Sequence, residues 1–272
     1  MSKAIPLFFW SSKVFENKPK ENYGDLLSIY IVARVSGSAV QFYNAPKAQK
    51  SWFVRQRRYL MAIGSIMTYT QPKAQVWGSG IISRDSVFSN AHFMAVRGPL
   101  SRKRILELGY SCPEIYGDPA LLLPHFYKSS AKKKHKLGII PHYVDYDKVQ
   151  AWYENDEQVQ IIDLLTVDAL KTTDEIKACD RIISSSLHGV IVAQAYGIPA
   201  IWVRFSDKLS GDNVKFEDYF LSVGIKPYTG VLVNESLTET QVDDLFLKYP
   251  NVIETSILKQ LQEGLLKAFP AT

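Results

Sequence analysis

The stretch that decides the fold of this chain reads Arg181-Ile-Ile-Ser-Ser-Ser-Leu-His-Gly-Val-Ile-Val-Ala-Gln-Ala-Tyr-Gly-Ile-Pro-Ala-Ile-Trp-Val-Arg204. Its pattern predicts a short apolar strand, a polar turn, an amphipathic helix that ends at Gly197, and a second strand after Pro199. A strand, a helix and another strand in this order form the repeating unit of a parallel sheet. The sequence therefore predicts an α/β protein.

The first turn of that helix carries His188, directly after three serines. In open parallel sheets, ligands bind in the crevice at the carboxyl ends of the strands. A helix amino terminus at that edge offers unpaired N–H groups and the positive end of its dipole to an anion. Because an imidazole can transfer protons beside such an anion, we predict that His188 is catalytic. The alternative is a structural histidine of the core.

Apolar strands alternate with helical patterns on both sides of this stretch, which predicts two α/β units in series. Strands are predicted at 5–10, 74–82, 93–97, 114–116, 137–142, 159–164 and 181–184, and helices at 25–34, 99–108, 147–154, 168–179 and 254–268. Asp25 is the predicted N-cap of the first helix, which is apolar nearly all round and should be deeply buried.

A lysine-rich segment at 128–136 lacks apolar periodicity and is typical of a linker. We therefore expect an N-terminal α/β domain over 1–130 and a C-terminal α/β domain over 131–272 that carries the Ser-Leu-His-Gly turn. The last helix of the chain is free to pack back on the N-terminal domain.

The composition of the chain narrows the possible functions but does not identify one. The chain has 272 residues, 46% of them hydrophobic, which is enough for one large core or two medium ones. A net charge of +5 is compatible with anionic small substrates, nucleic acid or an anionic membrane surface. Cys112 and Cys179 form no Cys-x-x-Cys pair, which predicts a reducing, cytosolic compartment and no disulfide. No segment approaches the ~20 apolar residues that cross a membrane.

Several common site types are disfavoured. The sequence has neither a Gly-x-Gly-x-x-Gly motif that enters a helix nor a Walker-type phosphate loop. The five histidines show no metal-ligand spacing, so we expect no metal. The basic clusters at 55–58, 102–104 and 132–136 lack the interleaved aromatic residues of a nucleic-acid platform, so we expect no nucleic acid. They are interpreted as solvated faces, or as a peripheral contact with anionic lipid headgroups.

Four segments at predicted strand ends place a glycine beside a polar residue: Asn22-Tyr-Gly-Asp25, Gly78-Ser-Gly80, Arg97-Gly-Pro99 and Gly117-Asp118. Glycine permits positive φ angles and a close approach of the backbone to a ligand. A purely structural turn is the alternative at each one. Because parallel strands end on one rim, we expect the four segments to converge there.

Three cations are candidates for holding an anion at that rim. Arg97 ends an apolar strand, where a cation is costly unless it is paired or aimed at a ligand. Its alternative is a salt bridge to an acid such as Asp118. Arg204 ends the strand after Pro199, and Lys215 lies in the segment that follows. For Lys215 the alternative is a solvated side chain.

Taken in order, these motifs resemble the polysaccharide pyruvyl transferase family, over roughly residues 20 to 225. The matching elements are Asn22-Tyr-Gly-Asp25 with Leu27-Ser28, Gly78-Ser-Gly80, Arg97-Gly-Pro-Leu-Ser101, Gly117-Asp-Pro-Ala-Leu121, Pro141-His-Tyr143, and Ser186-Leu-His-Gly-Val-Ile-Val-Ala193 with Gly197-Ile-Pro199.

The resemblance implies two Rossmann-like domains that face each other across a cleft, as in GT-B glycosyltransferases. It implies phosphoenolpyruvate as donor, with no cofactor. The implied acceptor is a sugar in a capsule, exopolysaccharide or other cell-envelope polysaccharide, or in its lipid-linked precursor. The product is a pyruvate ketal. We expect a cytoplasmic protein, either free or peripherally bound at the inner face of the membrane.

The resemblance also assigns roles to residues. His188 is the expected general acid and base, because the histidine side chain ordinarily exchanges protons near neutral pH. Many family members carry an arginine directly before the Leu-His pair, where this chain has Ser186. Phosphoenolpyruvate would therefore be held by Arg97, Arg204 or Lys215 and by the backbone from Ser186 and Leu187 onward. The residues expected to bind the acceptor or line the cleft are Asn22, Gly24, Asp25, Gly78, Ser79, Asp118, His142 and Ser185.

Two other functions fit the same patterns. One is a GT-B-type glycosyltransferase that uses a nucleotide sugar, because a fold does not dictate a function. The other is a non-catalytic module that binds a polysaccharide precursor. The sequence indicates neither the acceptor sugar nor the oligomeric state.

Overall fold

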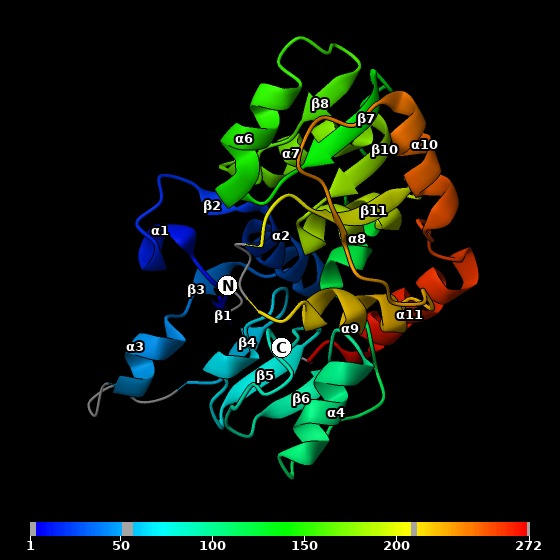
Figure 1. Ribbon diagram of the computed structural model, residues 1–272. Helices are drawn as coiled ribbons and strands as arrows, with labels where there is room; N and C mark the ends of the chain where they lie inside the picture. Colours follow the sequence, from blue (N-terminus) through cyan, green and yellow to red (C-terminus); the bar gives the residue numbers. More distant parts are fainter. Residues whose placement is uncertain (1–3, 51–56, 208–210, 271–272) are drawn as a thin grey trace.

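A computed structural model describes residues 4–50, 57–207 and 211–270, and it contains two parallel five-stranded sheets (Figure 1). The first sheet has the order β3 (Val40–Phe42), β1 (Ile5–Phe8), β4 (Tyr59–Met61), β5 (Ala74–Trp77) and β6 (His92–Ala95). The second has the order β12 (Val231–Leu232), β11 (Ala200–Arg204), β10 (Cys179–Ser184), β7 (His135–Ile140) and β8 (Val159–Ile161). The predicted α/β class with two Rossmann-like units is confirmed.

Both sheets have the same strand order. Numbered along each half of the chain, the strands lie in the order 2-1-3-4-5. The order reverses between β1 and β4 in the first sheet and between β7 and β10 in the second. Ligands of doubly wound sheets bind at such a reversal, beyond the carboxyl ends of the two strands. The decisive stretch of sequence therefore supplies one of the two strands at the reversal in the second sheet.

Two helices lie between the sheets, α2 (Tyr23–Ser36) and α8 (Leu187–Ala195) (Figure 1). Their apolar residues join one core that contains strand residues of both sheets, such as Leu60 and Ile182. The buried position of α2 was predicted. The amphipathic character predicted for α8 is wrong, because every residue of α8 except His188 is buried.

The N-cap of α2 differs from the prediction. The side chain of Asn22 accepts a hydrogen bond from the N–H of Gly24 at 3.0 Å, so Asn22 is the N-cap and Asp25 lies inside the first turn. Asparagine and aspartate cap helices about equally well, so residue type alone does not favour Asp25 over Asn22.

The remaining helices are not all on the outside, because residues such as Phe216, Tyr219 and Leu265 belong to the same core between the sheets. These helices are α1 (Ser12–Phe15), α3 (Ala45–Lys50), α4 (Pro99–Glu107), α5 (Leu123–Phe126), α6 (Tyr146–Trp152), α7 (Ala169–Lys177), α9 (Val214–Ser222), α10 (Glu239–Lys248) and α11 (Thr255–Ala268), with 3-10 turns η1 (Met67–Tyr69), η2 (Pro119–Leu122) and η3 (Tyr143–Asp145). The predicted helices that became α4, α6, α7 and α11 are confirmed within a few residues.

Two predicted segments differ from the structure. The strand expected at 114–116 is reduced to an isolated bridge between Val96 and Tyr116. The segment 128–136 is irregular only to Lys134, because β7 begins at His135. In the basic cluster 55–58, residues 55 and 56 lie outside the described residues.

Several contacts join the two halves within the described part of the chain. A short ladder pairs β2 (Glu21–Asn22) with β9 (Leu165–Thr166). Helix α9 packs on α4. Helix α11 lies against the N-terminal half, where Trp77 Nε1 donates to the Leu265 carbonyl at 2.8 Å and Gln262 Nε2 donates to the Leu121 carbonyl at 2.8 Å.

Cys112 and Cys179 are both buried free thiols. Burial raises the pKa of each thiol to about 12, which keeps both in the unreactive protonated form at neutral pH. Among the described helices, none is long and apolar enough to cross a membrane.

Candidate active site

His188 occupies the first turn of α8, immediately beyond the carboxyl end of β10. Its Nε2 lies 3.7 Å from Oδ2 of Asp118. Both atoms are buried, and neither has a hydrogen-bond partner within the described part of the chain. The other oxygen of Asp118 accepts from the Ala120 N–H at 2.9 Å, which fixes the carboxylate at the start of η2. An imidazolium at His188 would therefore face a fixed, buried negative charge.

Gly24 lets the two halves meet at His188. A Cβ atom on Gly24 would lie 2.1 Å from Nδ1 of His188, so any larger residue would displace the ring. This close approach explains why the Asn22-Tyr-Gly-Asp25 motif has a glycine at position 24. Asn22 contributes by capping the helix that carries Gly24.

Asp25 is a buried acid beside this contact. Asp25 is 8% exposed, and no described group donates a hydrogen bond to its carboxylate. Burial raises the pKa of Asp25 well above its ordinary value, and the neighbouring charges of Glu21 and Glu16 raise it further. Asp25 is thus a carboxyl group that can hold a proton where ordinary aspartates cannot.

A serine turn links the ends of β10 and β7 at the strand-order reversal. Ser184 Oγ donates toward the Ile140 carbonyl and accepts from the Ser186 N–H at 3.0 Å. Ser185 Oγ accepts from the N–H of His142 at 2.8 Å. Ser186 is the N-cap of α8, and its side chain makes no capping hydrogen bond. The first N–H groups of the helix, from Leu187 on, are therefore not satisfied by a cap.

Lys215 lies close to Arg97 and to His142. Burial lowers the pKa of His142 to about 4, with a smaller contribution from the charge of Lys215. Burial likewise lowers the pKa of Lys215 to about 8, with a smaller contribution from Arg97. Among the described residues, no carboxylate forms an ion pair with Lys215. Lys215 is therefore a largely desolvated cation without a counter-charge.

Each of the three guanidinium nitrogens of Arg97 donates a hydrogen bond to the protein. Its Nε donates to Oδ2 of Asp218 at 3.1 Å, and both side chains of this ion pair are 0% exposed. The two terminal nitrogens donate to Ser65 Oγ at 2.6 Å and to the Ile81 carbonyl at 2.7 Å. Asp218, rather than Asp118, is thus the acid that pairs with Arg97.

Arg204 is also engaged. Its Nε donates to the Gly230 carbonyl at 3.0 Å, and its Nη1 pairs with Asp207 at 2.5 Å. Of the three predicted cations, Lys215 alone lacks an ion-pair partner in the part of the chain that the structure describes.

Gly78 and Ser79 build the loop behind the site. Gly78 has a φ of 90°, and a Cβ there would lie 2.3 Å from Cδ of Pro119. Ser79 is fully buried and donates to the Gly64 carbonyl at 2.7 Å. The structure therefore gives both residues a packing role beside η2, the turn that presents Asp118.

Sequence reasoning missed two contributors. Glu16 accepts hydrogen bonds from Trp10 Nε1 at 2.6 Å and from the Tyr143 hydroxyl at 3.0 Å, and so connects the two halves beside His142. Asp218 binds Arg97 across 121 positions of sequence. Neither acid lies in a recognisable motif, and no local pattern could have indicated partners so far along the chain.

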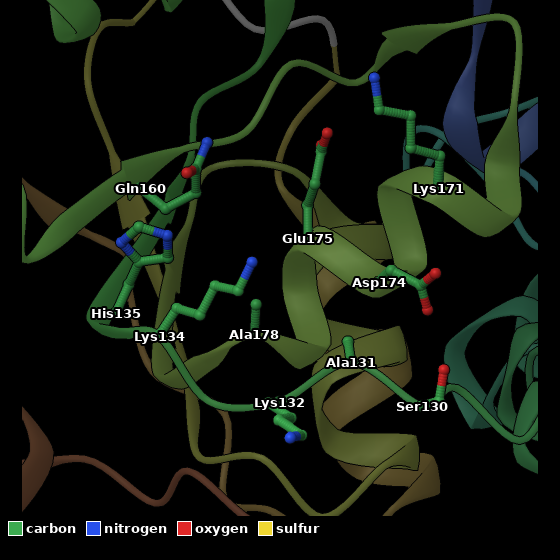
Figure 2. A pocket seen from close by; sticks show the side chains of 10 residues that line it. All are labelled: Ser130, Ala131, Lys132, Lys134, His135, Gln160, Lys171, Asp174, Glu175 and Ala178. Atoms are coloured by element: carbon green, nitrogen blue, oxygen red, sulfur yellow. The ribbon is translucent and has the colours of Figure 1, made fainter.

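A separate hollow of about 510 Å³ opens on the C-terminal half (Figure 2). Its lining residues are Ser130, Ala131, Lys132, Lys134, His135, Gln160, Lys171, Asp174, Glu175 and Ala178. His135 begins β7 and Ala178 precedes β10, so the hollow lies at the amino ends of these strands. His188 follows the carboxyl end of β10, on the opposite edge of the sheet. Because doubly wound sheets bind ligands at the carboxyl edge, we place the candidate active site at His188.

Comparison with known proteins gives two findings. Residues 73–207 match the sequence model of a family described as polysaccharide pyruvyl transferase. The chain is also 30% identical over 219 residues to "Uncharacterized protein L143" of Acanthamoeba polyphaga mimivirus, a match that covers 75% of this chain and 74% of the viral protein. The family match includes Arg97, Asp118 and His188, whereas Gly24 and Lys215 lie outside it.

Proposed function

The chain belongs to the polysaccharide pyruvyl transferase family, and from this premise we propose that it transfers pyruvate from phosphoenolpyruvate to hydroxyls of a sugar. The sugar is part of a cell-surface polysaccharide, such as a capsule or exopolysaccharide, or of its lipid-linked precursor, and the product is a pyruvate ketal. The observation that carries the proposal is the buried pair of His188 and Asp118 at the start of α8, with Lys215 as a cation that lacks an acid partner.

The donor is assigned to the cationic side of this site. Phosphoenolpyruvate carries a phosphate and a carboxylate, and both attract cations and helix N–H groups. Lys215 and the open N–H groups at the start of α8 provide these contacts. Lys215 then takes the role of the arginine that many relatives have at the position of Ser186. Arg97 contributes its positive charge, and its hydrogen-bonding groups stay on protein partners.

The proposed chemistry has three proton transfers. His188, as imidazolium, protonates the methylene carbon of phosphoenolpyruvate, and the adjacent carbon gains cationic character. Asp118 stabilises the imidazolium. A first sugar hydroxyl attacks that carbon and gives its proton to His188, which replaces the proton now in the methyl group. A second hydroxyl attacks, the carbon–oxygen bond to phosphate breaks, and the second hydroxyl proton leaves with the phosphate.

We place the reaction in the cytosol, with the protein either free or bound at the inner face of the membrane. Two buried, unpaired thiols support a reducing compartment. Exposed lysines such as Lys132 and Lys134 support a contact with anionic headgroups.

The experiment that tests the proposal incubates the purified protein with phosphoenolpyruvate and a panel of sugar acceptors. The expected result is phosphate release together with a mass gain of one acceptor that equals pyruvate addition. Transfer from a nucleotide sugar to the same panel would instead identify a glycosyltransferase. Acceptor binding without phosphate release, measured by calorimetry, would identify a non-catalytic binding module. Either of these outcomes contradicts the proposal.

A further inference from the structure

Resting on the proposed function, we infer that Asp218 is a positioning residue for the donor. It anchors α9 to the N-terminal half and balances the charge of Arg97, and it thereby keeps Lys215 in place and protonated beside phosphoenolpyruvate. Asp218 itself touches neither donor nor acceptor in this assignment.

The carboxylate of Asp218 receives four hydrogen bonds. Oδ1 accepts from the N–H groups of Leu100 at 2.8 Å and Ser101 at 3.0 Å. Oδ2 accepts from Ser101 Oγ at 2.6 Å and from Arg97 Nε at 3.1 Å. Asp218 is fully buried. A carboxylate with all its acceptor positions matched is held in one geometry.

Two of these bonds satisfy the amino terminus of α4. The N-cap of α4 is Gly98, which has no side chain to cap the helix. Asp218 supplies the missing acceptor from another helix, and its negative charge also suits the positive end of the α4 dipole. A Cβ on Gly98 would lie 2.0 Å from the Asp218 carbonyl, so the glycine permits this close packing. Helix α9 is therefore fixed on α4.

The same helix carries Lys215. Residues three apart in an α-helix lie on one face, so Lys215 extends from the face that Asp218 anchors. Lys215 lies near Arg97 of the N-terminal half and His142 of the C-terminal half. Displacement of α9 from α4 would move the ammonium group out of this position.

The charges lead to the same conclusion. The groups that face Lys215 are Arg97, beyond β6, and His142, beyond β7. Glu217 of α9 is instead paired with Arg84 at the exposed side. Arg97 disfavours the ammonium form of Lys215, and Asp218 is the carboxylate that pairs with Arg97, so removal of Asp218's charge would leave the charge of Arg97 without its compensation. Because the pKa of Lys215 is already about 8, loss of this compensation would deprotonate it close to neutral pH.

Asp218→Asn separates charge balance from helix capping. Asparagine retains an oxygen for the N–H groups of Leu100 and Ser101, but it turns an NH₂ group toward Arg97 Nε. We expect the KM for phosphoenolpyruvate to rise roughly tenfold, equivalent to about 1.4 kcal/mol of binding. The alkaline limb of kcat/KM should move to lower pH by about half a unit or more. The KM for the acceptor should stay unchanged.

Two variants complete the test. Glu217→Gln removes the same charge from the same helix at the Arg84 side, and it should leave both the KM for the donor and the alkaline limb in place. Lys215→Arg combined with Asp218→Asn should abolish the alkaline limb, because arginine does not lose its proton. Wild-type donor KM and pH profile in folded Asp218→Asn would overturn the inference.

Asp218→Glu carries the test if Asp218→Asn does not fold. It keeps the negative charge but lengthens the side chain, so the donor KM should rise while the alkaline limb stays where it is. An unchanged donor KM in this variant would also overturn the inference.

A measurement without substrate separates this inference from the proposed function. Competitive labelling with acetic anhydride across a pH series, read by peptide mass spectrometry, gives the ionisation of Lys215 directly. A lower midpoint in Asp218→Asn supports the positioning role even if no acceptor is ever pyruvylated. An identical midpoint in the two proteins contradicts it, whatever the enzyme assays show.

Discussion

Nε2 of His188 and Oδ2 of Asp118 lie 3.7 Å apart, and neither of these two atoms has a hydrogen-bond partner in the described chain. Buried polar atoms of folded proteins are nearly always paired. A small movement of the ring would close this gap into a hydrogen bond. The arrangement therefore suits a group whose charge changes during turnover.

Replacement of His188 tests its role in proton transfer. In His188→Ala, phosphate release from phosphoenolpyruvate in the presence of acceptor should fall by about 10² to 10⁴, the usual contribution of a general acid or base. The check is a coupled phosphate assay. Thermal melting serves as the control for folding, and near-normal turnover by the folded variant would exclude His188 as the acid.

Gly24 offers a steric test of the same contact. Gly24→Ala should displace the His188 ring and destabilise the protein by about 1–3 kcal/mol, because the added carbon would overlap Nδ1. Urea denaturation and phosphate release are the measurements. Gly264→Ala in α11, where the nearest atom to a new Cβ lies 3.6 Å away, is the matched control and should be neutral or slightly stabilising. Equal effects of the two substitutions would rule out the steric explanation.

At the scale of elements, the strand–turn–helix around His188 was predictable and its partners were not. The apolar periodicity of the sequence indicates β10, α8 and β11, and Gly197 marks the end of the helix. The same pattern suggested an amphipathic α8, because nothing in the sequence shows that a second sheet covers its other face. Likewise, residue type identified Arg97 as a costly buried cation, but its pairing with Asp218 depends on how α9 packs on α4.

We predict that the stability of the protein depends on pH because of His142, in the turn after β7. Burial lowers the pKa of His142 in the folded protein to about 4, from an ordinary value of about 6.5. The unfolded chain thus binds the proton more tightly, so stability is complete above pH 6.5 and is lost as the pH falls toward 4. The full loss is up to about 3 kcal/mol.

His142→Asn should reduce this acid-side loss while keeping a side-chain acceptor for the Val144 N–H. Urea denaturation at pH 4.5 and pH 7 measures it: wild type should lose more stability between the two pH values than the variant. The same slope in both proteins would show that other groups cause the loss.

For the whole molecule, a single core connects the two sheets, and α9 and α11 return from the C-terminal half to the N-terminal half. The lysine-rich segment at 128–136 suggested a division of the chain into two stretches. We still propose a division near residue 130, with one sheet on each side of it. The contacts of Asp218, Gln262 and Leu265 with the first half show why composition alone does not describe the packing.

Leu265 tests how strongly the last helix holds the molecule together. It is fully buried in the shared core, so Leu265→Ala should cost about 2–5 kcal/mol of unfolding free energy. Urea denaturation followed by tryptophan fluorescence is a suitable measurement. Leu266→Ala, at the next and exposed position, is the control and should change stability by less than about 0.5 kcal/mol. A comparable loss in both variants would contradict a core role for Leu265.

The return of α11 has a consequence for how the protein is made. Trp77 receives its hydrogen-bond partner from Leu265, 188 positions later, and Arg97 receives its counter-charge from a helix that is also synthesised late. During translation, the first sheet therefore leaves the ribosome before Arg97 has its counter-charge and before part of its apolar surface is covered. Domains often fold in order as they emerge. In this chain, the N-terminal half cannot complete its packing until α11 has been synthesised.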